Sequence, residues 1–192
     1  MKYEVLRRKL EMAKNVFSKP YAQDIFYAIK SASKGAKRKT IFEPDGLNRY
    51  LESERQIAEG TFRLDERIAA SQREYRWRFD GMNGLSPKRQ AYLETLLKEA
   101  KRDGAEVVLY LTTLHPKLVE TLSRETKYAL LLRLTQEYIA KIGNEFGIAT
   151  FDLSDPSNFG GNVTDWYDGA HVSAPNAELI ARKISTQRKN GI

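Results

Sequence analysis

Two short apolar segments, separated by a long helical region, most constrain the fold of this chain. Residues 105–112 and residues 148–153 are near-continuous apolar runs of the length expected for strands buried on both faces of a sheet. Between them, residues 116–146 are rich in leucine and predict helix, with a break at 124–127 and an end at Gly147. This alternation predicts an α/β protein whose strands run parallel.

Helical segments flank this unit on both sides. Ser86 is a good N-cap and Pro87 suits the first helical position, so we expect a helix from there to Gly104. Ser173 is expected to cap a last helix with an apolar stripe over residues 177–184. The second half is therefore predicted to be helix, strand, helix, strand, loop and helix, the order of a doubly wound sheet.

The segment before residue 80 gives weaker signals. Residues 40–42 are expected to form a short strand, which the turn sequence at 44–46 ends. Residues 48–74 favour helix, with an interruption at Gly60. Residues 75–79 alternate aromatic residues with arginines, which predicts a strand with its three rings on one face. Such a segment also stacks single-stranded bases, but because no second one exists, nucleic acid is not expected as a partner.

The net charge of +7 is concentrated at one end of the chain. Residues 1–40 hold eleven Lys and Arg against three acidic residues, a net charge of +8, so the remainder sums to −1. Apolar residues at helical spacing over 2–17, and again from Tyr21, predict a basic helical arm over residues 1–39. Such an arm suits an anionic surface or polymer, although a solvated helical face without a ligand explains the same charges.

Composition excludes several kinds of site. The 192 residues contain no cysteine and only two histidines, which excludes disulfides and thiolate metal sites and argues against a multi-histidine zinc site. We therefore expect no metal and no cofactor. No run approaches the roughly 18 apolar residues of a membrane span, and the N-terminal segment lacks the apolar core of a signal peptide.

One of the two histidines belongs to the most informative short motif. Asp168 and His171 are three residues apart, on a loop that follows residues 148–153 and precedes the last predicted helix. At this spacing a carboxylate can fix the tautomer and orientation of an imidazole, which then serves as a general base. The alternative is structural: Asp168 ends a turn, and His171 is a surface residue before an N-cap.

The other histidine, His115, follows residues 105–112. Ligands of doubly wound sheets bind beyond the carboxyl ends of the strands, so both histidines are expected at the same edge. The sequence thus predicts Asp168 and His171 as catalytic residues and His115 as a substrate-binding residue.

Residues 167–175 (Tyr-Asp-Gly-Ala-His-Val-Ser-Ala-Pro), after a strand and a loop, resemble the D-x-x-H block of the SGNH/GDSL hydrolase superfamily. They look most like its bacterial envelope branch of glycan O-acetyltransferase-like proteins, in which a strand ends in a turn similar to residues 112–116. The resemblance covers about residues 85–185. It implies a flavodoxin-like three-layer sandwich and a triad in which Asp168 orients His171 and His171 activates a serine.

The chain departs from that pattern where the nucleophile is expected. In the superfamily the serine follows the first strand, but residues 40–42 lead into Glu-Pro-Asp-Gly. Residues 81–83 superficially resemble the Gly-x-Asn oxyanion block, but no apolar strand precedes them. There are also fewer convincing strands than the family usually has. We therefore interpret residues 40–192 as the C-terminal part of an SGNH-like α/β domain with an incomplete sheet.

Two functions from different classes follow. The first is an ester hydrolase or acyltransferase domain that acts on an acylated glycan or small ester, and to whose Ser-His-Asp site this chain contributes Asp168 and His171. The alternative is a non-catalytic binding or assembly protein that holds acidic polysaccharide or envelope surfaces through the cleft and the basic arm. The retained Asp and His favour the first, and the missing serine favours the second. The resemblance suggests the bacterial cell envelope as the location.

Overall fold

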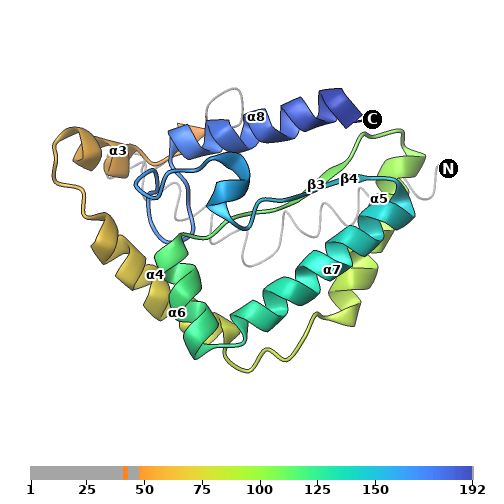
Figure 1. Cartoon of the computed structure of the whole chain (residues 1–192), viewed down its shortest axis with the longest axis horizontal. Coiled ribbons are helices and arrows are strands. Elements are labelled where there is room, and N and C mark those ends of the chain that lie inside the picture. Colours follow the sequence, from red (N-terminus) through yellow and green to blue (C-terminus); the bar gives the residue numbers. More distant parts are fainter. Residues whose placement is uncertain (1–40, 43–47, 192) are drawn as a thin grey trace, which may run out of the picture. The chain divides into compact units, whose positions relative to one another are not determined.

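The structure, a computed structural model, describes residues 41–42 and 48–191 (Figure 1). The chain divides into two units, Met1–Ile41 and Phe42–Ile192, and apart from Ile41 every described residue belongs to the second. The basic arm predicted over residues 1–39 lies outside the described residues, as does the turn predicted at 44–46. The strand predicted at 40–42 is present as β1 (Ile41–Phe42).

A short strand and two helices follow β1. They are β2 (Asn48–Arg49), α3 (Leu51–Ala58) and α4 (Leu64–Phe79). The predicted interruption at Gly60 is confirmed. Gly60 has a φ of 68°, a left-handed conformation that glycine adopts without steric cost, and the chain turns there between the two helices.

The predicted strand, helical crossover and strand are present. They are β3 (Val108–Leu111), α6 (Pro116–Glu125), α7 (Tyr128–Phe146) and β4 (Ala149–Asp152). β3 and β4 pair in parallel, with Val108 opposite Ala149. The break predicted at 124–127 is confirmed, and Gly147 ends α7 in the left-handed region, as predicted.

The sheet is smaller and less buried than the sequence predicts. β3 and β4 make a parallel sheet of two strands within the described residues. Tyr110, in the middle of β3, is 52% exposed, so the expectation of strands buried on both faces is wrong at this position. Figure 1 shows α7 and α8 on opposite sides of the two strands. The described part is thus mixed α/β and mostly helical.

The two helices that flank this unit begin where the sequence predicts. α5 (Pro87–Arg102) is capped by Ser86, whose hydroxyl accepts the Arg89 N–H. After β4 come the 3₁₀ helix η1 (Pro156–Phe159) and α8 (Ala174–Gly191). Ser173 stands directly before α8, and its carbonyl accepts the Ala177 N–H at 3.0 Å, so its N-cap position is confirmed. No described helix is both long and apolar enough to cross a membrane.

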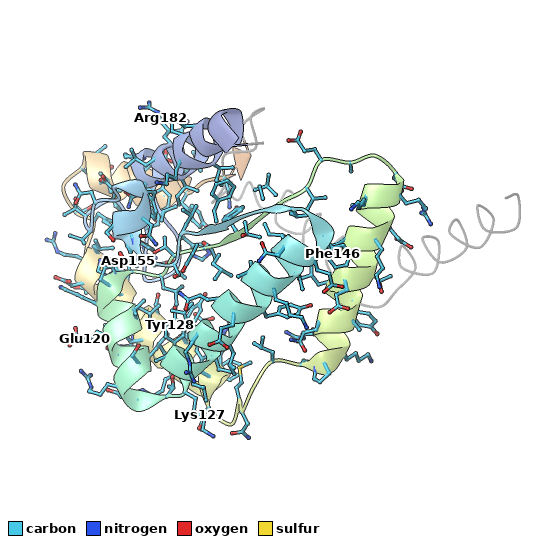
Figure 2. All side chains as sticks on the ribbon, turned by 45° about the vertical axis from the view of Figure 1, so that its right-hand side comes forward. Glu120, Lys127, Tyr128, Phe146, Asp155 and Arg182 are labelled. Atoms are coloured by element: carbon cyan, nitrogen blue, oxygen red, sulfur yellow. The ribbon has the colours of Figure 1, made fainter. Side chains whose placement is uncertain are left out.

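Two buried clusters hold these elements together, and Figure 2 labels one residue of each, Phe146 and Tyr128. Phe146 packs with Leu97 and Ile142 between α5 and α7. Tyr128 packs with Leu118 and Leu122 where α6 meets α7. Full burial of each such leucine contributes about 1.5–3 kcal/mol.

The strand predicted at 75–79 is wrong, because α4 continues as helix through Phe79. Tyr75 and Phe79 pack against the cluster of Leu118 and Leu122, whereas Trp77 between them is 68% exposed. Residues i and i+4 share one face of a helix, so a five-residue alternation fits helix and strand equally well. The contacts with α6 decide between the two.

Candidate functional site

The loop that contains Asp168 and His171 is a tight hairpin. Trp166 and Val172 form an antiparallel bridge, and the Tyr167 N–H donates to the His171 carbonyl at 2.8 Å. The three residues after Tyr167 therefore form the tip. The hairpin itself sets the three-residue spacing between the acid and the histidine.

A buried amide anchors the base of this hairpin to α8. Asn176 is fully buried, and its Nδ2 donates to the carbonyls of Asn162 at 2.8 Å and Asp165 at 3.0 Å. Its Oδ1 accepts the Asn162 N–H at 2.9 Å. The Ser173 N–H completes the base by donating to the Asp165 carbonyl at 3.0 Å. The site is thus built on a loop fixed at both ends.

The Asp168 carboxylate organises the tip. Its Oδ1 accepts the backbone N–H of Ala170 at 2.7 Å and of His171 at 2.8 Å, and its Oδ2 lies 2.9 Å from His171 Nδ1. Burial alone would raise the pKa of Asp168, but the hydrogen bonds from His171 and Ala170 lower it below its ordinary value. One carboxylate therefore both folds the turn and orients the ring, so the structural and the functional interpretation describe the same contacts.

His171 presents its other nitrogen outward. Because Nδ1 faces a carboxylate, we place a proton there, which leaves the lone pair of the neutral ring on Nε2. The side chain is 51% exposed, and no described residue hydrogen-bonds to Nε2. The hydrogen bond to Asp168 raises the pKa of His171 above its ordinary value, although burial opposes the shift. This arrangement is suited to accept a proton from a group bound outside the hairpin.

The tip docks on two other elements through Gly169. Its N–H donates to Ser71 Oγ of α4 at 3.1 Å, and its carbonyl accepts the His115 N–H at 2.9 Å. A Cβ at position 169 would lie 2.7 Å from Ser71 Cβ, so only glycine allows this approach. Since His115 follows the carboxyl end of β3, these bonds bring the hairpin to that end of the sheet.

His115 has a different environment from His171. It is 3% exposed and packs edge-on against Trp166, with ring centroids 5.3 Å apart. Its Nδ1 accepts the Lys117 N–H and caps α6, and its Nε2 lies 3.0 Å from the Val163 carbonyl. Burial lowers the pKa of His115. Both ring nitrogens are bonded to backbone groups, so a role in binding substrate stays a prediction that requires this ring to exchange partners.

Aromatic and charged residues from the start of the described chain surround the hairpin. The Tyr50 ring lies 5.4 Å from the His171 ring and 4.8 Å from the Tyr167 ring. Tyr167 Oη donates to Glu54 Oε1 at 2.9 Å, and Glu54 pairs with Arg49. Burial and this bond raise the pKa of Tyr167 to about 12. Sequence reasoning missed these neighbours because they lie more than a hundred residues before the hairpin, with no local motif.

No serine hydroxyl among the described residues bonds to His171. Ser71 Oγ donates to the Arg67 carbonyl at 3.1 Å, and Ser154 Oγ donates to Asp152 at 2.5 Å. The hydroxyl of Ser86 caps α5. Other serines lie outside the described residues, namely Ser18, Ser31 and Ser33.

Two further kinds of group do not contribute to this hairpin within the described residues. Within residues 48–186, no cluster of three or more His, Asp or Glu side chains has the geometry to hold a metal ion. Asn83, of the segment that resembles an oxyanion block, accepts a hydrogen bond from Lys127 at the start of α7. No described contact joins Asn83 to Asp168 or His171.

Comparison of the chain with known proteins found no matching family model, no matching curated protein and no matching solved structure. A function for this chain is therefore inferred from the geometry of the hairpin and from the resemblance of residues 167–175.

Proposed function

We propose that this chain supplies Asp168 and His171 to an SGNH-like site that hydrolyses an ester or transfers its acyl group. The substrate is an acylated glycan or a small ester. The main support is the 2.9 Å contact between His171 Nδ1 and Asp168, which leaves Nε2 half-exposed and without a described partner. Such an imidazole is a general base.

The proposal extends to the fold. We infer an incomplete flavodoxin-like three-layer sandwich, in which β3 and β4 belong to the parallel sheet and helices lie on both of its faces. The parallel register and the positions of α7 and α8 on opposite sides of the strands support this (Figure 1).

In the reaction, His171 Nε2 takes the proton of a serine hydroxyl as the oxygen attacks the acyl carbonyl. When the tetrahedral intermediate collapses, Nε2 returns this proton to the leaving alcohol. Water, or a sugar hydroxyl in a transferase, then releases the acyl group by the same two proton transfers. Asp168 stabilises the imidazolium between these steps. Proton transfer of this kind contributes about 10²–10⁴-fold to the rate.

The lack of a described serine bonded to His171 favours a second candidate, a non-catalytic binding or assembly protein. Such a protein holds acidic polysaccharide or an envelope surface, to which residues 1–40 contribute their net charge of +8. Its binding falls steeply as salt rises, because exposed charges are screened over about 10 Å at 0.1 M ionic strength.

Hydrolysis of p-nitrophenyl acetate and of acetylated xylo-oligosaccharide by the whole chain tests the first candidate. Because no described serine is bonded to His171, we expect only slow turnover, in which Nε2 takes the proton of water in place of a serine hydroxyl, so that the rate still depends on His171. His171→Asn should remove it, Asp168→Asn should lower it about tenfold or more, and Asp103→Asn, an exposed carboxylate elsewhere, should leave it unchanged. A rate equal in the parent chain and in His171→Asn contradicts the proposal.

A serine-directed phosphonate identifies any nucleophile within the chain. We expect it to leave the slow rate unchanged. If the phosphonate abolishes turnover, mapping the labelled peptide identifies the serine, with Ser86 and Ser154 as the first candidates because they stand near element ends.

A further inference from the structure

A cavity of about 700 Å³ lies beside the hairpin, on the side of Tyr167 and the start of α8. Tyr167 is part of its wall and also contacts the Tyr50 ring, which in turn contacts the His171 ring. The cavity is thus two ring contacts from the candidate base. Its volume is within the range of small-molecule sites, about 300–1,000 Å³.

One part of the wall is apolar. Ile57, Phe62 and Pro175 line it, and Ile57 is 48% exposed, a high value for a large aliphatic side chain beside a cavity. These side chains come from α3, from the segment after Gly60 and from the first turn of α8. They suit the C–H face of a ligand but offer it no hydrogen bond.

The other part of the wall includes two polar residues, Asp165 and Ser173. Neither the Asp165 carboxylate nor the Ser173 hydroxyl has a hydrogen bond to a described residue. Ser173 stands at the N-cap position of α8, yet its hydroxyl does not cap the helix, unlike that of Ser86 on α5. Because it has no partner among the described residues, this hydroxyl is available to a ligand.

The charges of the wall select against an anion. The Glu54 carboxylate forms an ion pair with Arg49 and accepts a hydrogen bond from the Tyr167 hydroxyl, so the negative charge of Glu54 is balanced by the positive charge of Arg49. Asp165 then adds one negative charge, which the positive end of the α8 dipole offsets in part. A ligand with several neutral hydroxyls meets these conditions, since it donates to Asp165, accepts from Ser173 and presents C–H groups to Phe62.

We propose that this cavity binds a neutral sugar, as the glycan subsite of an O-acylated carbohydrate whose ester group lies at His171. The inference rests on the proposed function for the identity of the ester site. Sugar binding itself does not require His171 to be catalytic. The subsite consists of the apolar patch of Ile57 and Phe62 opposite the acceptor Asp165 and the hydroxyl of Ser173.

Binding of cellobiose and xylobiose to the whole chain, followed by amide NMR shifts, tests the proposal. We expect shifts at Tyr167, Ser173 and Ala174. Asp165→Ala and Ile57→Ser should each weaken binding about tenfold, because each removes a direct contact. Asp103→Ala is the matched control and should change nothing, and unchanged thermal unfolding of each variant excludes a folding defect.

Two results would overturn the subsite. The first is no shift at these residues up to about 50 mM of either disaccharide, far above the millimolar range in which weak sites bind. The second is tighter binding of glucuronate than of the neutral sugars. His171→Asn separates the two proposals: it should abolish ester turnover and leave disaccharide binding unchanged. Binding without any His171-dependent turnover keeps the subsite and removes the hydrolase, whereas turnover without binding removes the subsite alone.

Discussion

The two histidines of this chain occupy neighbouring turns but differ in burial and in the hydrogen-bond partners of their rings. His115 and the Asp168–His171 hairpin are joined by a backbone hydrogen bond, and both precede a helix. His115 is buried with both ring nitrogens on backbone groups, whereas His171 has one nitrogen on a carboxylate and the other exposed. A position at the carboxyl end of a sheet therefore does not by itself make a histidine able to accept a proton from a ligand. The hydrogen-bond partners of its two ring nitrogens determine this.

The largest expected effect comes from removing each ring. His115→Ala should lower the free energy of unfolding by about 3 kcal/mol, because it leaves a cavity beside Trp166 and removes the bonds to Lys117 and Val163. His171→Ala should cost less than about 1 kcal/mol, since the side chain is half-exposed. Urea unfolding at pH 7 measures both. Equal losses in the two variants would erase the contrast between a structural and a functional histidine.

Gly169→Ala addresses the bond between the two turns. The new Cβ would lie 2.7 Å from Ser71 Cβ and 2.9 Å from Leu118 Cδ2, so we expect a loss of about 2 kcal/mol. Gly84→Ala is the matched control, because its Cβ meets no atom within 4 Å. A variant at 169 as stable as the one at 84 would show that the hairpin does not dock on α4.

Ser71→Ala tests the same docking with a smaller expected loss of stability. It removes the acceptor of the Gly169 N–H and should cost about 1 kcal/mol. Because the Gly169 carbonyl still accepts the His115 N–H, ester turnover should fall only as far as the hairpin loosens. A complete loss of turnover with unchanged stability would instead make Ser71 a catalytic group.

The sequence predicts the part of this architecture that depends on local signals. Backbone conformation or capping predicts the helix ends at Gly147, Pro116 and Ser86. The helices of the structure begin or end at these positions. The contact between Asp168 and His171 is equally local, because both belong to one hairpin. At 75–79 the local signal was ambiguous, and the strand predicted there was wrong.

Tertiary neighbours could not be predicted in the same way. Tyr50, Glu54 and Ser71 reach the hairpin from α4 or from residues before it, and nothing in their own segments indicates this. The burial of His115 against Trp166 is also a long-range contact, so nothing in its own segment shows that the ring predicted to bind substrate is packed inside the protein. Each further strand of a larger sheet would require its own apolar run, and the sequence contains only two such runs.

The smallest expected change in stability comes from Asp168→Asn. In the folded chain the pKa of His171 is raised and that of Asp168 is lowered. The His171 contribution is full below its ordinary pKa and is lost as the pH rises through its folded pKa. The Asp168 contribution is present above its ordinary pKa and is lost as the pH falls through its folded pKa. The variant should therefore lose most stability between about pH 4 and 6.5, by less than about 1 kcal/mol because the pair is partly exposed.

Urea unfolding of the parent chain and of Asp168→Asn at pH 5.5 and pH 9 measures this difference. The gap between the two should narrow at pH 9, where His171 is neutral. A gap that grows with pH would mean that the two side chains do not form an ion pair.

The most direct test of the account is an NMR titration of the two imidazole rings, assigned with His171→Asn. We predict one pKa on each side of the ordinary histidine value of about 6.5: His171 above it, because of Asp168, and His115 below it, because of burial. Asp168→Asn should lower the pKa of His171 and leave that of His115 unchanged. Two rings with the same pKa, or a His171 resonance indifferent to Asp168→Asn, would contradict the assignment of Asp168 and His171 as an acid–base pair.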